Sequence, residues 1–259
     1  MQLSDIAYAP LADNLTEGQR RQLEAYAALL FAEAMPAGFI GDCTPEELFL
    51  RHILDSILPA IAPESQVAFP LNSAVALSVF DLGAGAGLPS LPLAVLFPQH
   101  EFHLLDSQEK RCRFAQSAAA AVGLKNVHVY HGVVQDFAQK YGKDNKADVV
   151  VFRAFRKILV SLELALHVLR DAPASDGVAP RRAQPKVLYW RSQRVPFSEE
   201  GLARVSDLGY NIDNFVKFTS AETIIPRGLY TFSRVRAAKS AFPRSWKKIS
   251  ADRLVEVES

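Results

Sequence analysis

The sequence predicts an α/β fold in which a seven-stranded, mostly parallel sheet is covered by helices and follows a helical segment. Short apolar runs alternate with helical patterns after residue 70, which is typical of parallel βαβ units. A glycine-rich turn joins the first of these runs to a helix. The chain has 259 residues, of which 49% are hydrophobic and 22% charged, so it can bury one large core.

The N-terminal segment is expected to form two helices. The first follows Thr16, where a capping-box pattern precedes apolar residues at helical spacing, and it ends at Pro36. The second is predicted over residues 45–61, because Thr44 and Glu47 form another capping box around a proline at the first helical position. The polar flank of this helix comprises Arg51, His52, Asp55 and Ser56.

The later elements alternate between strands and helices. Parallel strands are expected at residues 75–81, 101–106, 127–131, 147–152 and 187–190. Helices are expected from residue 89, from Ser107, and at 155–170 and 197–208. Strands at 211–218 and 229–235 are predicted to form an antiparallel edge.

These elements divide the chain into three parts. Residues 1–68 are expected to pack as a helical segment on the core, residues 69–235 to form the main domain, and residues 236–259 to form a basic tail. Within the main domain, residues 171–185 are rich in turn-forming residues and lack a period, so a mobile loop is expected there.

The turn after the first strand of the sheet reads Asp81-Leu-Gly-Ala-Gly-Ala-Gly-Leu88. Gly83, Gly85 and Gly87 lack the Cβ atoms that would keep a ligand away from the backbone. Twenty-three residues after Gly83, the second strand ends in Asp106, whose carboxylate can accept hydrogen bonds from a ribose diol. These signals indicate a nucleoside cofactor, although a glycine turn can also serve only to pack a helix against a strand.

The glycine spacing and the local charge favour S-adenosylmethionine as that cofactor. The dinucleotide fingerprint has glycines at its first, third and sixth positions, whereas this turn has them at the first, third and fifth. Asp81 adds a negative charge, which suits a sulfonium and an ammonium better than a pyrophosphate. A Rossmann-like domain that binds S-adenosylmethionine is therefore expected, and a nicotinamide-dependent oxidoreductase is the weaker alternative.

Basic residues are concentrated near the C-terminus, although the net charge is only +1. Residues 227–248 contain seven basic residues, no acidic residue, and the aromatic residues Tyr230, Phe232, Phe242 and Trp246. Such a segment can neutralise phosphates and stack on unpaired bases. The alternative interpretation is a terminal strand followed by a solvated tail, and the two interpretations are compatible with each other.

Other features argue against membrane and metal partners. No apolar run approaches the roughly 20 residues that span a bilayer, and the N-terminus lacks the pattern of a signal peptide, so we expect a cytoplasmic protein. Cys43 and Cys112 have no neighbour at metal-ligand or redox spacing. His128 and His131 lie three residues apart on a predicted strand and so face opposite sides, and no metal is expected.

Four stretches carry a resemblance to a known family. They read Arg51-His-Ile-Leu-Asp-Ser56, Asp81-Leu-Gly-Ala-Gly-Ala-Gly-Leu-Pro-Ser-Leu-Pro-Leu93, Leu105-Asp-Ser-Gln-Glu-Lys-Arg-Cys-Arg-Phe114 and Arg153-Ala-Phe155. Together they resemble the bacterial 16S rRNA guanine-N7 methyltransferases (RsmG, or GidB), from about residue 14 to residue 235. The resemblance implies a class I methyltransferase fold, S-adenosylmethionine as cofactor, and 16S rRNA or the small ribosomal subunit as partner.

The resemblance also implies roles for individual residues. It puts Gly83 and Leu88 beside the methionine part of the cofactor, Val134 and Gln135 beside the adenine, and Arg153 near the reaction centre; for Arg153 the alternative is a surface ion pair. With the residues of the turn argument, the expected cofactor-binding set is Gly83, Gly85, Gly87, Leu88, Asp106, Val134, Gln135 and Arg153. Candidates for holding the RNA are Arg51, His52, Arg191 and Arg227. A helix-capping or core-edge role is the alternative for His52.

The chain departs from the family pattern at four places. It has Gly38-Phe-Ile-Gly41 in place of Asn-Leu-Thr, Trp190-Arg191-Ser192 in place of Leu-Lys-Gly, Gln135 in place of an acid, and Ser90 in place of a glycine. The expected activity is methylation of guanine N7, which has a lone pair and no proton, by in-line displacement without a catalytic base. The alternative prompted by the departures is a non-catalytic RNA-binding or ribosome-assembly protein that retains the fold.

Overall fold

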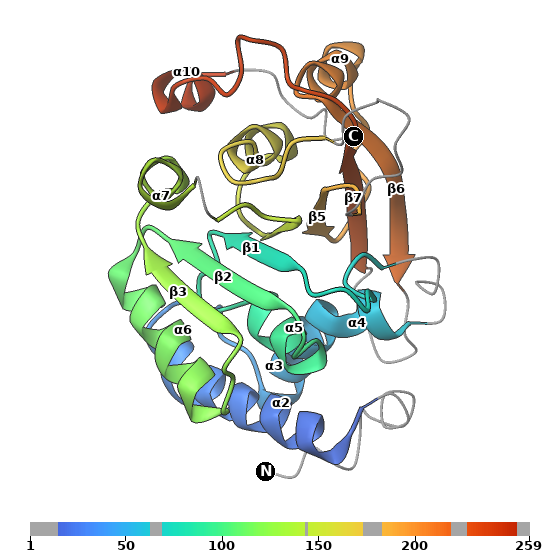
Figure 1. Cartoon of the computed structure of the whole chain (residues 1–259). Helices are drawn as coiled ribbons and strands as arrows, with labels where there is room; N and C mark the ends of the chain where they lie inside the picture. Colours follow the sequence, from blue (N-terminus) through green and yellow to red (C-terminus); the bar gives the residue numbers. More distant parts are fainter. Residues whose placement is uncertain (1–14, 63–68, 143–144, 173–182, 219–226, 253–259) are drawn as a thin grey trace.

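A single mixed sheet forms the centre of the protein. The computed structural model describes residues 15–62, 69–142, 145–172, 183–218 and 227–252. Its sheet has seven strands in the order β3-β2-β1-β4-β5-β7-β6 (Figure 1). The strands are β1 (Ser78–Leu82), β2 (Glu101–Asp106), β3 (Val127–His131), β4 (Val149–Arg153), β5 (Lys186–Arg191), β6 (Tyr210–Phe218) and β7 (Arg227–Arg234). Strands β1 to β5 are parallel and β7 is antiparallel to β5 and β6, which confirms the predicted sheet.

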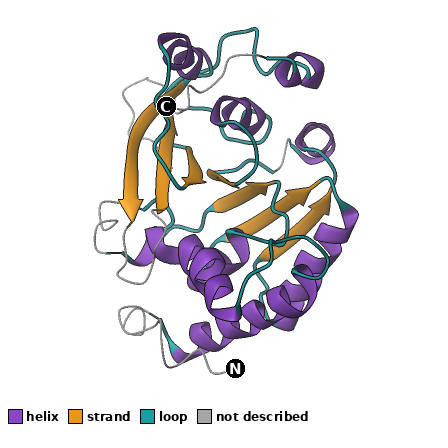
Figure 2. Ribbon diagram, turned by 180° about the vertical axis from the view of Figure 1, so that it is seen from behind, coloured by secondary structure: helices purple, strands orange, loops and turns teal. Residues whose placement is uncertain are grey.

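Helices cover both faces of this sheet. One face carries α2 (Glu17–Leu29), η2 (Leu30–Ala34), α3 (Pro45–Leu48), η3 (Phe49–Leu54), α4 (Asp55–Ile61), α5 (Ser90–Leu96) and α6 (Glu109–Ala121). The opposite face carries α7 (Val134–Tyr141), α8 (Ile158–Ala165), α9 (Glu199–Asp207) and α10 (Trp246–Ser250). Figure 2 shows the same division from behind. None of the described helices is long and apolar enough to cross a membrane.

Alternating side chains of the central strands supply a hydrophobic core to each helical layer. In β4, Val149 and Val151 belong to the core under α2 to α6, whereas Val150 and Phe152 belong to the core under α7 to α10. This alternation follows from the two-residue period of a strand, and both sets are buried because helices cover both faces. Because β1 pairs in parallel with both β2 and β4, the carboxyl ends of these three strands lie at one edge of the sheet.

The helix predicted over residues 45–61 is present, but its middle turn is wider than expected. The Phe49–Leu54 stretch is a π-helix between α3 and α4. Pro59 follows within α4 and lacks an N–H, so it cannot donate to the Asp55 carbonyl four residues earlier. That carbonyl instead accepts the indole N–H of Trp190 at 3.1 Å, which ties the helix to β5.

Other boundaries differ by a few residues. Helix α8 spans Ile158–Ala165 instead of 155–170, because Leu169 leaves the helix to form a parallel bridge with Ala147. Helix α6 begins at Glu109 instead of Ser107, because the preceding Gln108 N–H is bound by Asp106. Most of the loop predicted at 171–185 lies outside the described residues.

Candidate functional site

The glycine turn after β1 is fixed by packing as well as by backbone conformation. Gly83 has a φ of +83°, and a Cβ atom there would lie 2.1 Å from the ring of Phe155. Gly87 has a φ of +95°, and its Cβ would lie 2.6 Å from Leu91. Side chains are strained at such φ values and would also clash, so both positions need glycine. For Gly87, the need to pack the helix against the strand is a sufficient reason for glycine. Gly83, in contrast, also lines a cavity.

Asp106 at the end of β2 holds this turn in place. Its Oδ2 accepts the Gly85 N–H at 2.9 Å, and its Oδ1 accepts the Gln108 N–H at 2.8 Å. The residue is only 7% exposed, yet it lines the same cavity as Gly83. A carboxylate offers about four lone-pair sites, so each oxygen can accept a further hydrogen bond from a ligand.

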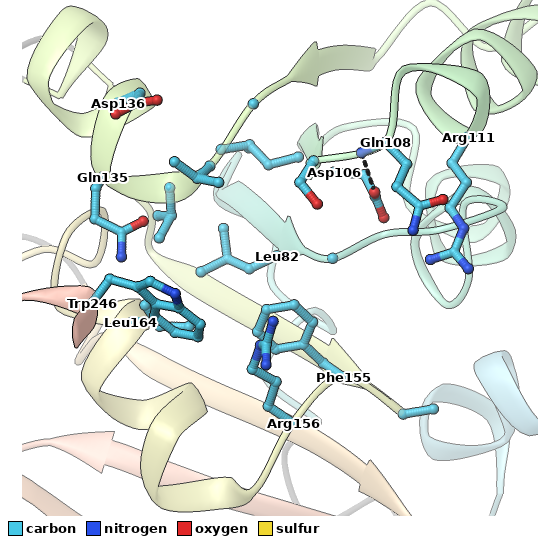
Figure 3. Close-up of a pocket in the computed structure, with 17 residues that line it drawn as sticks. Leu82, Asp106, Gln108, Arg111, Gln135, Asp136, Phe155, Arg156, Leu164 and Trp246 are labelled. Carbon is cyan, nitrogen blue, oxygen red and sulfur yellow. Dashed lines mark hydrogen bonds between the residues drawn. The ribbon is translucent and has the colours of Figure 1, made fainter. Parts of the chain in front are cut away.

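A cavity of about 640 Å³ lies beyond the carboxyl ends of β1 to β4 (Figure 3). This volume is within the range of small-molecule sites, and the position is where open α/β sheets bind ligands. Of the predicted cofactor-binding residues, Gly83, Asp106, Val134 and Gln135 line it. The lining does not include Gly85, Gly87, Leu88 or Arg153.

The cavity has a second wall that the sequence did not assign to the cofactor. It is formed by Phe155, Arg156, Leu164 and Trp246 (Figure 3). Ala154 has a φ of +48°, an unusual backbone conformation for a residue with a side chain, and the next residue places its ring against Gly83. Neither Phe155 nor Trp246 was predicted to line the cavity. In the sequence, Phe155 stood out only as part of the Arg153-Ala-Phe155 motif, and Trp246 only as an aromatic residue of the basic segment 227–248.

The side chain of Arg153, predicted to lie near the reaction centre, contacts the N-terminal helices. Its guanidinium lies 2.9 Å from Asp55 Oδ2 and also donates to the Arg51 carbonyl at 2.6 Å and to Ser56 Oγ at 3.2 Å. The two charged side chains are 12% and 4% exposed. The alternative considered for Arg153 was a surface ion pair, but this pair is buried and joins β4 to the polar flank of the 45–61 helix.

The RNA candidates come from the 45–61 helix, the end of β5 and the start of β7. Arg51 is half-exposed and forms an ion pair with Glu47 at 2.9 Å, and its neighbour His52 contacts Arg153 at 3.3 Å. Arg191 ends β5 and is in register with Gly228, so it lies beside the start of β7. The side chain of the remaining candidate, Arg227, lies outside the described residues.

Comparison with known proteins agrees with this geometry. A family model described as rRNA small subunit methyltransferase G (GidB) matches residues 19–174, more than half of the chain. The chain belongs to the GidB family. The match covers the N-terminal helices, the glycine turn and β1 to β4, and so includes both Asp106 and Arg153.

Individual relatives and solved structures extend the comparison. The ribosomal RNA small subunit methyltransferase G of Streptococcus pyogenes serotype M12 is 36% identical over 157 residues, covering 61% of this chain and 63% of the relative. That of Streptococcus agalactiae serotype V is 35% identical over 156 residues, covering 60% of this chain and 63% of the relative. The chain thus spans about 63% of the length of these relatives.

A mutant of MtNAS in complex with S-adenosylmethionine has a TM-score of 0.51 at 12% identity, covering 84% of this chain and 73% of that chain. At that identity the likeness concerns the fold alone, which is the Rossmann-like fold of class I methyltransferases.

Two departures from the GidB pattern have structural explanations. Gly38 has a φ of +69° and Phe39 N–H donates to the Ala34 carbonyl, so Gly38-Phe-Ile-Gly41 begins as the cap of the first helix. Ser90 donates to Asp81 Oδ2 at 2.7 Å, and both residues are buried. The hydroxyl at position 90 therefore satisfies one oxygen of a carboxylate that lies beneath the glycine turn.

The other oxygen of Asp81, Oδ1, is buried and has no hydrogen-bond partner within the described part of the chain. Burial raises the pKa of Asp81 to about 8, against the opposing effect of the Ser90 hydrogen bond. The side chain is therefore neutral at pH 7 in the folded protein, whereas it is ionised in the unfolded chain. A cationic group near Oδ1 would favour the ionised form.

Because of Asp81, the unfolding free energy of the protein is expected to fall as the pH rises. Between about pH 4 and pH 8 the native state keeps a proton that the unfolded chain has released, so each pH unit removes up to about 1.4 kcal/mol of unfolding free energy. Asp81→Asn lacks this proton, so urea unfolding at pH 5, 6.5 and 8 should show the variant gaining stability relative to wild type as pH rises. A difference that stays constant across this window would contradict the raised pKa.

Proposed function

We propose that the protein is an S-adenosylmethionine-dependent methyltransferase that methylates N7 of a guanine in small-subunit (16S) rRNA. The observation that carries this proposal is the Asp106 carboxylate, which lines the cavity and has one hydrogen bond on each oxygen. Membership of the GidB family and the names of the streptococcal relatives support the rRNA substrate.

The residues present fit the proposed cofactor. Asp106 can accept hydrogen bonds from both hydroxyls of a ribose. Val134 and Gln135, which also line the cavity, are proposed to contact the adenine, and Gly83 the methionine part. Asp81 does not line the cavity and is neutral at pH 7, so the negative charge that the sequence suggested at this turn is not part of the proposed fit. When bound, S-adenosylmethionine supplies an electrophilic methyl group on its sulfonium.

The protein's part in the reaction is alignment. Guanine N7 attacks with an in-plane lone pair and carries no proton, so no side chain has to act as a base. Holding the two reacting atoms in line can contribute about 7–11 kcal/mol in favourable cases. Arg51, His52 and Arg191 are proposed to hold the RNA, with Arg153 fixing the backbone of residues 51 and 52 through its hydrogen bonds.

The target is expected to be an unpaired or splayed guanine. In A-form RNA the N7 edge faces a deep and narrow groove that side chains do not enter. An arginine fork on O6 and N7, which is the common way to read guanine, would occupy the reacting atom. Recognition through O6 or the Watson–Crick edge is therefore proposed.

Transfer of a labelled methyl group tests the proposal. Small ribosomal subunits and free 16S rRNA from cells lacking the protein are incubated with labelled S-adenosylmethionine, and the digested nucleosides are separated by mass. We expect label in 7-methylguanosine with wild type and with Glu109→Ala, whose exposed carboxylate lies on α6 outside the cavity. Label in a different nucleoside would contradict the N7 assignment. RNA binding without any transfer would instead favour the non-catalytic alternative.

A further inference from the structure

We propose that Trp246 contacts the adenine of the bound cofactor, so that the C-terminal segment, residues 235–252, completes the cofactor pocket. This inference rests on the proposed function and adds a binding residue to it. The segment lies beyond the part of the chain that the GidB model matches, which ends at residue 174. It runs past α9 and α8 and ends in α10 (Figure 1), whose first residue, Trp246, lines the cavity.

Buried charges and an apolar contact hold the segment in place. Arg244 makes a two-pronged ion pair with Glu163 of α8, with Nε 2.9 Å from Oε1 and Nη2 2.6 Å from Oε2. The Glu163 side chain is only 1% exposed, so this pair is an internal anchor. Ile249 of α10 is also 1% exposed and belongs to the same core as α8. Planar two-pronged pairs of this kind fix geometry as well as charge.

The anchored segment puts an aromatic side chain on the cavity wall. Trp246 is 41% exposed and lines the cavity together with Gln135 and Leu164. Figure 3 shows the Gln135 amide directed toward the indole. The Arg156 guanidinium lies 4.7 Å from the centre of the indole ring, and this cation–π contact restrains the ring from one side.

The chemistry of this end of the cavity fits a purine. Asp106 is the candidate for the ribose, and Gln135 and Trp246 lie together at a different part of the same cavity (Figure 3). An adenine attached to that ribose needs an apolar aromatic surface and an amide able to hydrogen-bond at its edge, and these two side chains provide them. The seven basic residues of 227–248 suggest RNA as another partner, but Trp246 faces a cavity and its companion Arg244 is already paired.

Binding of S-adenosylhomocysteine to the full-length protein tests this inference. By calorimetry we expect Trp246→Ala to weaken binding at least fivefold, since stacking contributes about 1–3 kcal/mol per base. Lys248→Ala removes an exposed charge from the same helix and should leave the affinity unchanged. Tryptophan fluorescence gives a second readout of binding. Trp190 is buried and donates a hydrogen bond to the Asp55 carbonyl, so its fluorescence should not respond to the ligand. Wild type should therefore change its fluorescence on binding, and Trp246→Phe should not.

The outcomes separate this inference from the proposed function. If wild type and Trp246→Ala bind S-adenosylhomocysteine equally, the adenine contact is wrong. If Trp246→Ala leaves that affinity intact and raises only the KM for rRNA, the indole serves the RNA and the inference is again overturned. If Trp246→Ala fails to fold, the loss of the fluorescence change in Trp246→Phe decides. Absence of binding in wild type would overturn the proposed function itself.

Discussion

Asp106→Ala is expected to weaken S-adenosylmethionine binding at least tenfold. The substitution removes two acceptors for the ribose, and hydrogen bonds to a charged group contribute about 1.5–3 kcal/mol each. It also frees the Gly85 and Gln108 N–H groups, which loosens the glycine turn. Calorimetry on the two proteins gives the ratio directly.

Glu109→Ala is the matched control for that experiment. Glu109 is an acid three residues further along the chain, exposed in the first turn of α6, and outside the cavity lining. The control should bind as wild type does. Equal affinity of Asp106→Ala and Glu109→Ala for S-adenosylmethionine would contradict the proposed contact between Asp106 and the ribose.

Arg153→Ala is expected to cost about 3 kcal/mol of unfolding free energy or more. It leaves the Asp55 carboxylate, which is 4% exposed, without its partner at 2.9 Å, and breaking a buried pair costs about 3–5 kcal/mol. It also removes the hydrogen bonds from β4 to Arg51 and Ser56. Denaturant unfolding followed by circular dichroism measures the change.

The same helix provides the control for Arg153. Arg51 forms an exposed ion pair with Glu47, with side chains 45% and 40% exposed, so Arg51→Ala should change stability by less than about 1 kcal/mol. The double substitution Arg153→Met with Asp55→Leu should recover part of the loss, because no charge is then buried alone. Similar losses in Arg153→Ala and Arg51→Ala would show that the buried pair does not support the fold.

Local signals in the sequence were sufficient for the sheet and for part of the pocket. The alternation of strands and helices is a short-range pattern, and Gly83 and Asp106 sit at strand ends that parallel order must bring together. Contacts between residues far apart in the chain could not be predicted from such local patterns. Gly83 lacks a Cβ partly because the Phe155 ring lies against it, and that contact depends on how the chain turns after β4.

The partners of Arg153 and Trp246 show the same limit. Arg153 and Asp55 stood in separate motifs, and only the packing of the 45–61 helix against β4 brings them within 2.9 Å. Trp246 was noticed only as part of a basic segment that could bind RNA or form a solvated tail. Nothing in the sequence pattern indicates that Arg244 pairs with a buried Glu163 on α8 and so holds this segment at the cavity. The freed Asp55 carbonyl follows from Pro59, but its acceptance of the Trp190 indole needed the sheet.

The central claim is that the cofactor binds beyond the ends of β1 and β2 with its ribose on Asp106. A crystal structure of the protein with S-adenosylhomocysteine tests it most directly. We predict both ribose hydroxyls within hydrogen-bonding distance of the Asp106 carboxylate, with the adenine beside Val134 and Gln135. A ligand bound elsewhere, or bound in this cavity with its ribose away from Asp106, would contradict the account.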